Sequence, residues 1–327
     1  MSTPTHTAAS ALALIAPDMA EVDRVIARRL DSGVPLVAEV SSYIISAGGK
    51  RLRPALLLLM AGALGSTHPY RHQLAAVVEF IHTATLLHDD VVDDSTLRRG
   101  RATANVSFGN PASVLVGDFL YSRAFQMMVD VGDMRIMRVL ADTTNIIAEG
   151  EVLQLMNMHD ATLTEEGYLR VIRSKTAKLF EASARLPSVI DRSAAEVEAA
   201  CASYGQALGT AFQVIDDVLD YEGDATELGK NLGDDLREGK TTLPLIIAMQ
   251  RATADQQALI RRAIEEGDAS ELPALIEVVR QTGAMESTRA AASQEAQRAM
   301  QALEVLPPSS HRDALWALAA QLLDRRS

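Results

Sequence analysis

The chain has 327 residues, of which 48% are hydrophobic and only 4% aromatic, and this composition favours helices over sheets in one large domain or two. Its formal net charge of −12 argues against non-specific binding to nucleic acid. A single cysteine, Cys201, excludes an intrachain disulfide and fits a reducing compartment, so we expect a cytoplasmic protein.

The first part of the chain gives no sign of a membrane segment. Residues 8–16 are mildly apolar, but no lysine or arginine precedes them and Asp18 and Glu21 follow, so they make a poor signal peptide. The apolar run at 54–65 is shorter than the about 20 residues that a membrane span needs, and it predicts a buried helix. No transmembrane segment is therefore expected.

Helical periodicity continues along most of the chain. Alternating strand patterns of useful length are not found, so the sequence predicts an all-α bundle of roughly ten or more helices. Thr162 with Glu165 has the spacing of a capping box and predicts a helix start. The long central helices are expected at Arg71–Asp93, Ala112–Asp130, Arg135–Met158, Glu165–Leu186 and Ala194–Tyr221.

Two clusters of the form Asp-Asp-x-x-Asp lie near the predicted C-terminal ends of two of these helices. A helix turns about 100° per residue, so the first and last aspartates of each cluster point the same way. Crowded carboxylates repel each other, and the helix dipole adds to that cost, unless cations neutralise them. Oxygen ligands suit Mg²⁺ when phosphates complete its coordination. One such cluster is commonly a solvated acidic face, but two with the same spacing in apolar sequence predict a metal site. Its ligands would be Asp89, Asp90, Asp93, Asp216, Asp217 and Asp220.

Basic residues accompany these clusters. The segment at 48–54 reads GGKRLRP and combines a turn, three cations and a proline at a helix start, which suits an anionic phosphate as well as it suits a solvated turn. Arg98, Arg99 and Arg101 follow the first aspartate cluster directly. Metal ions on one side and cationic side chains on the other describe an enzyme that joins two diphosphate substrates.

At these motifs the chain resembles the trans-isoprenyl diphosphate synthases of the polyprenyl synthetase family. The resemblance covers nearly the whole chain after about residue 20 and rests on GGKRLRP, DDVVDDSTLRRG, SKTAKLF, and FQVIDDVLDYEGD followed by GK and GKTTLP. It implies the all-α isoprenoid synthase fold around a deep central cavity. A single domain would span residues 1–327, with about the first 20 residues flexible.

The resemblance also assigns residues to roles. The six aspartates would hold Mg²⁺, about three ions with the allylic diphosphate bound, and Lys175 and Lys240 would join them in catalysis. Further contacts to the allylic diphosphate would come from Arg98, Lys175, Thr176, Gln213, Lys230 and Lys240. The isopentenyl diphosphate would bind at Lys50, Arg53, His82 and Arg99. Taken individually, the lysines would be surface residues and His82 a core histidine.

Product length is expected to depend on four residues. Ala84 and Thr85 lie about one turn before Asp89, and because both are small a growing chain could pass them. Met128 and Leu140 are candidates for the floor of the cavity, and ordinary core packing explains each of them equally well.

The implied reaction is a Mg²⁺-dependent head-to-tail condensation of isopentenyl diphosphate onto an allylic diphosphate such as farnesyl diphosphate. Octaprenyl diphosphate, for quinone side chains, is the expected product of a homodimer that contacts the membrane transiently on product release. Two alternatives are a class I terpene cyclase and a non-catalytic subunit of a heteromeric synthase. Cyclases need no isopentenyl site, and non-catalytic subunits tend to lose the aspartate motifs, whereas both features are intact here.

Overall fold

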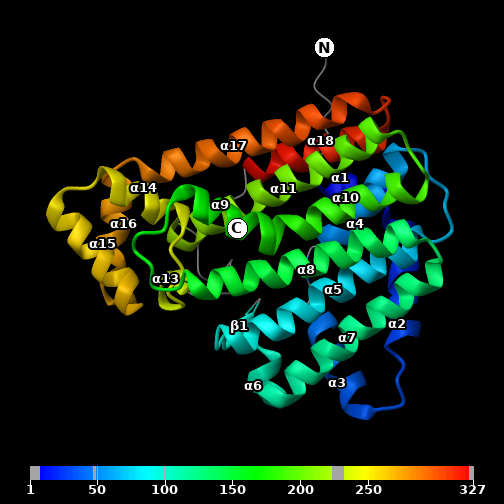
Figure 1. Ribbon diagram of the computed structural model, residues 1–327, viewed down its shortest axis with the longest axis horizontal. Helices are drawn as coiled ribbons and strands as arrows, with labels where there is room; N and C mark the ends of the chain where they lie inside the picture. Colours follow the sequence, from blue (N-terminus) through cyan, green and yellow to red (C-terminus); the bar gives the residue numbers. More distant parts are fainter. Residues whose placement is uncertain (1–7, 47–48, 50, 99, 223–231, 324–327) are drawn as a thin grey trace.

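The computed structural model describes residues 8–46, 49, 51–98, 100–222 and 232–323. The described residues are almost entirely helical, which confirms the all-α prediction. Most of the helices lie along one long axis (Figure 1). The strands of the described residues are β1 (Leu97–Arg98) and β2 (Arg101–Ala102), a short antiparallel hairpin with Leu97 opposite Ala102. No described helix is long and apolar enough to cross a membrane.

The N-terminal helices pack onto the bundle. The first two helices begin at Ala8 and Ala16, and Ala11 and Ile15 are buried. The apolar run at 54–65 lies in a buried helix as predicted, and each of its fully buried leucines stabilises the fold by roughly 1.5–3 kcal/mol. These helices are α1 (Ala8–Leu14), α2 (Ala16–Leu30), α3 (Pro35–Ser46) and α4 (Leu52–Ala63).

The long central helices agree with the sequence prediction to within a few residues at most ends. They are α5 (Arg71–Val92), α7 (Asn110–Val131), α8 (Met134–Met156) and α11 (Ala195–Glu222), with the short α6 (Ala104–Phe108) before α7. The helix expected over residues 165–186 is divided into α9 (Glu165–Ile172), a π-helical turn at Arg173–Ala177 and α10 (Lys178–Ile190).

The start of α9 differs from the capping box that the sequence predicts. Thr164, not Thr162, is the N-cap, and its hydroxyl oxygen accepts a hydrogen bond from the Gly167 N–H at 3.1 Å. The Thr162 hydroxyl instead donates to Asp160 at 2.6 Å in the preceding turn. Both threonines have N-cap chemistry, so local preference alone cannot choose between them.

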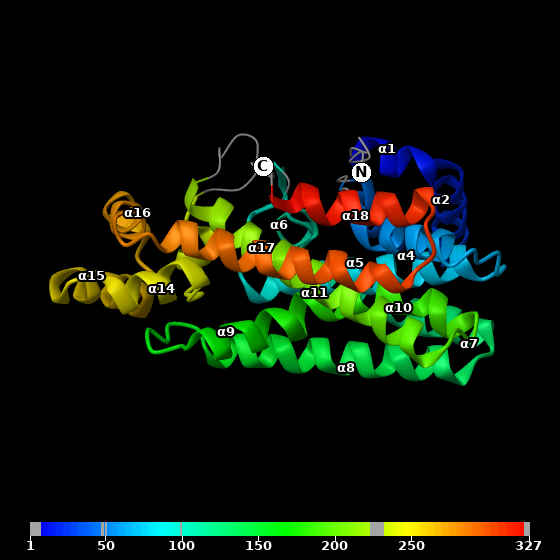
Figure 2. The ribbon, with the colours of Figure 1, turned by 90° about the horizontal axis from the view of Figure 1, so that it is seen from above.

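The last part of the chain forms one long helix and several shorter ones. Figure 2 shows α14, α15 and α16 at one end of the molecule, while α17 runs back along the bundle beside α11. The elements are α13 (Asp234–Arg237), α14 (Leu243–Arg251), α15 (Ala254–Glu266), a 3₁₀ turn at Ala269–Glu271, α16 (Leu272–Gln281), α17 (Ala284–Ala302), a 3₁₀ turn at Leu303–Val305 and α18 (Ser310–Leu323).

Two hydrophobic clusters form the interior, and α11 contributes to both. The larger cluster includes Phe80 of α5, Phe180 of α10 and Leu208 of α11. The smaller one includes Val218 of α11 and Leu275 of α16. Because α11 is shared, its C-terminal end is fixed between the main bundle and the helices at the end of the molecule.

Candidate active site

The first aspartate cluster lies at the C-terminal end of α5. Asp93 caps the helix, and its N–H donates to the Asp89 carbonyl at 2.8 Å. Burial raises the pKa of Asp89, and the neighbouring Asp93 carboxylate raises it further while Lys175 opposes the shift. Asp89 and Asp93 are therefore carboxylates that a bound cation would stabilise.

Asp90 has a different environment from its two neighbours in the cluster. It is fully buried, and one carboxylate oxygen accepts from the Arg98 guanidinium, at 2.8 Å from Nε and 2.6 Å from Nη2. Its other oxygen has no hydrogen-bond partner among the described residues. Arg98 comes from β1, so this ion pair fixes the hairpin against the end of α5.

Two lysines from distant segments reach the first cluster. Lys240 Nζ lies 2.8 Å from Asp93 Oδ2, and Lys175 Nζ lies 3.7 Å from Asp89 Oδ2. These contacts bring together the end of α5, the π-helical turn after α9 and the turn after α13. The family resemblance assigned both lysines to one site, and in the structure both contact the first cluster.

Two glutamates that sequence reasoning missed hold the same lysines. Glu151 of α8 lies 2.6 Å from Lys175 Nζ, and Glu238 accepts from Lys240 Nζ. Burial raises the pKa of Glu151 to about 7, with repulsion from Asp89 as the next cause, and burial likewise raises the pKa of Glu238. Only the fold brings Glu151 to Lys175, whereas Glu238 lies two residues before Lys240 in the sequence.

The carboxylates around the first cluster outnumber the cations that reach them, and this fits a site for divalent metal ions. Within the described ranges, however, no three acidic, histidine or cysteine side chains converge on a single point. Lys175 and Lys240 lie against Asp89 and Asp93, and Arg98 holds Asp90. Metal binding would thus require phosphate oxygens as additional ligands, which is the usual coordination of Mg²⁺ at phosphate sites.

The second aspartate cluster lies near the C-terminal end of α11, and protein donors hold part of it. Asp217 accepts at both carboxylate oxygens, from the Tyr168 hydroxyl at 2.6 Å and the Gln213 amide at 2.8 Å. Asp220 is also buried and accepts from the Asp235 N–H at 3.4 Å, a long contact. Burial raises the pKa of Asp217 well above its usual range, and the nearby Asp235 adds to the shift. Asp216 is the only half-buried member of this cluster.

The π-helical turn at Arg173–Ala177 presents Lys175 and Thr176 to the site. The Thr176 hydroxyl donates to Gln213 at 3.0 Å, and through Gln213 it is linked to Asp217. Gly150 of α8 and Gly209 of α11 approach this turn so closely that an added Cβ would meet its backbone at 2.7 Å. A π-helical turn widens the helix locally and is frequent at functional sites.

The residues expected to bind isopentenyl diphosphate are only partly described. Arg53 Nη1 lies 3.1 Å from His82 Nε2, and its guanidinium lies over the Phe180 ring at 4.5 Å. Arg53 and His82 come from α4 and α5, so the structure brings these two predicted residues together. The other two residues expected at this site, Lys50 and Arg99, lie outside the described residues, as does Lys230 of the expected allylic site.

The four residues expected to control product length lie along the bundle. Ala84 is fully buried on α5, and Met128 of α7 and Leu140 of α8 are buried in the same large cluster. Thr85 is half-buried, and its hydroxyl donates to the His82 carbonyl at 2.8 Å. Their burial fits either a cavity wall or ordinary core, so their role stays a prediction.

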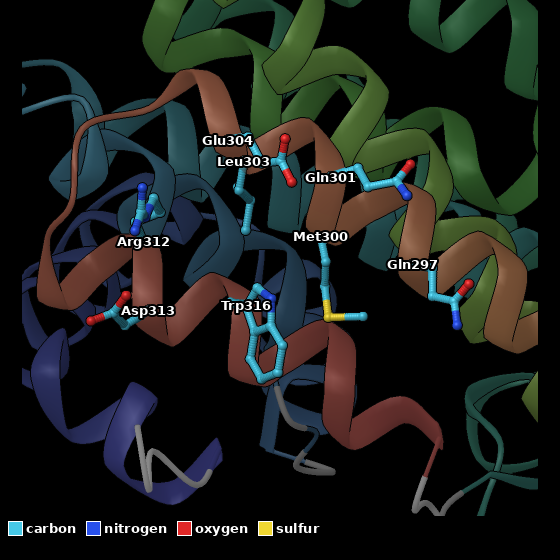
Figure 3. A pocket seen from close by; sticks show the side chains of 8 residues that line it. All are labelled: Gln297, Met300, Gln301, Leu303, Glu304, Arg312, Asp313 and Trp316. Carbon is cyan, nitrogen blue, oxygen red and sulfur yellow. The ribbon is translucent and has the colours of Figure 1, made fainter. Parts of the chain in front are cut away.

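A surface pocket between α17 and α18 lies apart from these residues (Figure 3). Trp316, Met300 and Leu303 supply its apolar lining, with Glu304 and Asp313 at the same pocket. A second pocket lies beside α9 and includes Arg170 and Ser174. Neither pocket is lined by an aspartate of the two clusters.

Comparisons with known proteins agree with this geometry. The family model for polyprenyl synthetases matches residues 34–279. The octaprenyl diphosphate synthase of Escherichia coli strain K12 is 52% identical over 307 residues, which cover 94% of this chain and 95% of that protein. The all-trans-nonaprenyl-diphosphate synthase (geranyl-diphosphate specific) of Rhodobacter capsulatus is 47% identical over 315 residues, covering 96% and 97%. A crystal structure of polyprenyl synthase from Caulobacter crescentus CB15, complexed with calcium and isoprenyl diphosphate, superposes with a TM-score of 0.95 at 42% identity and covers 100% of both chains.

The chain therefore belongs to the polyprenyl synthetase family and has its all-α isoprenoid synthase fold. It is a prenyltransferase, as the motifs predicted.

Proposed function

We propose that this prenyltransferase condenses isopentenyl diphosphate head-to-tail onto an allylic diphosphate, such as farnesyl diphosphate, and that Mg²⁺ is required. The observation that carries the proposal is the convergence of Lys175 and Lys240 on the first aspartate cluster. A group that binds a leaving diphosphate must combine cations with carboxylates that hold metal ions, and this site has both.

We propose the following roles for the residues of the site. The aspartates of the two clusters, with Asp89, Asp93 and Asp216 the less buried members, would hold about three Mg²⁺ ions, which supply positive charge to the departing diphosphate. Lys175 and Lys240 would add direct contacts to that diphosphate, and Thr176 and Gln213 would orient it. Arg98, fixed on Asp90, and Lys230 would complete the allylic site.

The second substrate must keep its diphosphate, so it is better held by side chains than by metal ions. Arg53 and His82, which lie 3.1 Å apart, would bind the isopentenyl diphosphate together with Lys50 and Arg99. Attack by its double bond on the allylic cation joins the two chains. A proton then leaves the new chain, and the released diphosphate is the base that we propose.

The product is proposed to be a long all-trans chain, octaprenyl diphosphate, used for quinone side chains. Two observations support it: Ala84 and Thr85 are small, and the relative from Escherichia coli is named for the octaprenyl product. Met128 and Leu140 would floor the cavity that receives the chain.

We also propose that the chain is a single domain and acts as a homodimer in the cytoplasm. Large apolar side chains are exposed on α7 and α8, among them Leu115 at 66%, Leu155 at 57% and Met156 at 75%. Such side chains on adjacent helices suit a protein interface, and a symmetric dimer would cover them. Transient membrane contact would serve only the release of the apolar product.

An assay of the purified protein alone tests the function. The protein would be incubated with labelled isopentenyl diphosphate, farnesyl diphosphate and Mg²⁺, and the dephosphorylated products separated by chain length. Incorporation into a long chain is expected. Conversion of farnesyl diphosphate without incorporation would instead indicate a terpene cyclase, and no turnover without a partner would indicate a non-catalytic subunit.

A further inference from the structure

We propose that His159, in the loop between α8 and α9, is a positioning residue that fixes Lys240 in the allylic diphosphate site. The inference rests on the proposed function, because it assigns Lys240 to that diphosphate. His159 belongs to none of the motifs that mark this family, and it does not itself reach either aspartate cluster.

The peptide group that joins Gly239 to Lys240 is held from both sides. The His159 N–H donates to the Gly239 carbonyl at 2.8 Å, and the Lys240 N–H donates to the Asp235 carbonyl at 2.8 Å. The next residue is tied to the same loop, since the Thr241 hydroxyl donates to the Asp160 carbonyl at 3.0 Å. The backbone of Lys240 therefore has its orientation set largely by the loop that carries His159.

The imidazole of His159 fixes that loop in place. Its Nδ1 lies 3.0 Å from the Ile264 carbonyl near the C-terminal end of α15, which makes Nδ1 the protonated donor. The ring also fills the space between two glycines with positive φ. A Cβ added to Gly239 would lie 2.5 Å from the nearest ring atom, and one added to Gly267 would lie 3.1 Å from it. The side chain thus joins three segments: the α8–α9 loop, the Lys240 turn and the end of α15.

The backbone conformation of His159 agrees with this role. Its φ is +62°, a left-handed conformation in which histidine and asparagine are enriched and most other residues are strained. Asparagine would keep both that tolerance and an N–H donor near the position of Nδ1. Alanine would lose the donor and the packing against the two glycines.

The ammonium group of a lysine lies at the end of a long side chain, so it reaches its partner only if the backbone has the right orientation. Lys240 Nζ contacts both Asp93 and Glu238, so a small rotation of its turn would remove it from the first cluster. Misplacement of a catalytic group by about 1 Å can cost roughly a hundredfold in rate. Loss of the His159 side chain should therefore weaken the allylic site and leave the isopentenyl site intact.

The test measures the Kd of farnesyl thiolodiphosphate, an allylic analogue that does not ionise readily, by calorimetry in Mg²⁺. His159→Ala should weaken binding roughly tenfold, in the range of one lost charge-assisted contact, and His159→Asn should restore most of it. Lys240→Ala should weaken binding by at least as much. In the Lys240→Ala background, His159→Ala should change the Kd less than about twofold, because the residue acts through the lysine. The Kd of isopentenyl diphosphate should change little in every variant.

Thr241→Val and His68→Ala complete the design. Thr241→Val removes the second hydrogen bond to the loop, so it too should weaken binding of the analogue. This variant gives the test if His159→Ala folds poorly. His68, which precedes α5 at the opposite end of that helix from Asp89, supplies the matched loss of a loop imidazole and should have no effect. If Lys240→Ala left the analogue's Kd unchanged, the proposed role of Lys240 would fail. If Lys240→Ala weakened binding but His159→Ala had no effect, or had its full effect in both backgrounds, the inference about His159 would fail.

Discussion

The two aspartate clusters share one sequence pattern but differ in what surrounds them. At the end of α5, Asp89 and Asp93 face the ammonium groups of Lys175 and Lys240. At the end of α11, Asp217 is enclosed by the Tyr168 hydroxyl and the Gln213 amide, and no described lysine reaches it.

This difference shows that one spacing supports two kinds of carboxylate. The second aspartate of each cluster is buried and held by protein donors, Asp90 by Arg98 and Asp217 by Tyr168. The first aspartate of each, Asp89 or Asp216, remains half-buried. We infer that the buried carboxylates also fix the ends of the helices, and that added cations reach the half-buried ones more readily.

The largest expected effect comes from the half-buried first aspartate of each cluster. Asp89→Ala and Asp216→Ala should each lower kcat by roughly a thousandfold or more, because they remove charge stabilisation that matters most as the diphosphate departs. Both proteins should fold, since deleting one of several repelling carboxylates relieves repulsion. Steady-state turnover at saturating Mg²⁺ and the Tm check both points. A folded variant that kept more than about a tenth of the wild-type activity would show that its cluster has been assigned incorrectly.

The next largest effect distinguishes the binding sites of the two diphosphate substrates. Lys175→Ala should raise the KM for the allylic substrate by roughly ten- to a hundredfold, as expected for a lost charge-assisted contact. Arg53→Ala and Lys50→Ala should instead raise the KM for isopentenyl diphosphate. Measuring both KM values for each variant gives the comparison, and equal changes for both substrates in all three variants would contradict the division into two sites.

A smaller effect is expected at the buried Asp217 of the second cluster. Tyr168→Phe removes the hydroxyl that donates to Asp217, so stability should fall by about 1–3 kcal/mol and the Tm should drop measurably. Because Asp217 is linked through Gln213 to Thr176, the allylic KM should also rise a few-fold. Tyr204→Phe is the matched control, since its buried hydroxyl donates to the Leu315 carbonyl in the large core. It should cost similar stability without changing either KM. Identical KM values in both variants would contradict the proposed connection between Asp217 and the allylic site.

Sequence periodicity predicted the long helices well, because their apolar faces pack into one core. It could not predict the π-helical turn at Arg173–Ala177, which depends on the close approach of Gly150 and Gly209 from other helices. The choice of Thr164 over Thr162 as the N-cap also depends on tertiary context.

The site shows the same division between pattern and context. The aspartates and lysines stand in motifs whose spacing reports their chemistry. Glu151, Tyr168 and His159 are single residues in ordinary helical or loop sequence, and only folding brings them to their partners. Pairs separated by long stretches of chain, such as Lys240 with Asp93, leave no periodic signal.

The last prediction has the smallest effect on turnover and concerns product length. Ala84 lies five residues before Asp89 on α5, and Ala211 lies five residues before Asp216 on α11; both are fully buried. If the growing chain passes along α5, Ala84→Tyr should truncate the product to about three or four isoprene units and preserve the first condensation, because a wall blocks elongation without touching the carboxylates. Ala211→Tyr introduces the same ring beside the other cluster, where it should overpack the core and lower the Tm without shortening the product that remains.

Met128→Ala should lengthen the product if Met128 is the floor. Product length by chromatography and Tm by calorimetry decide the matter: a wild-type chain length from folded Ala84→Tyr would mean that the tunnel does not follow this face of α5, and the basis for assigning a long product from Ala84 and Thr85 would be lost.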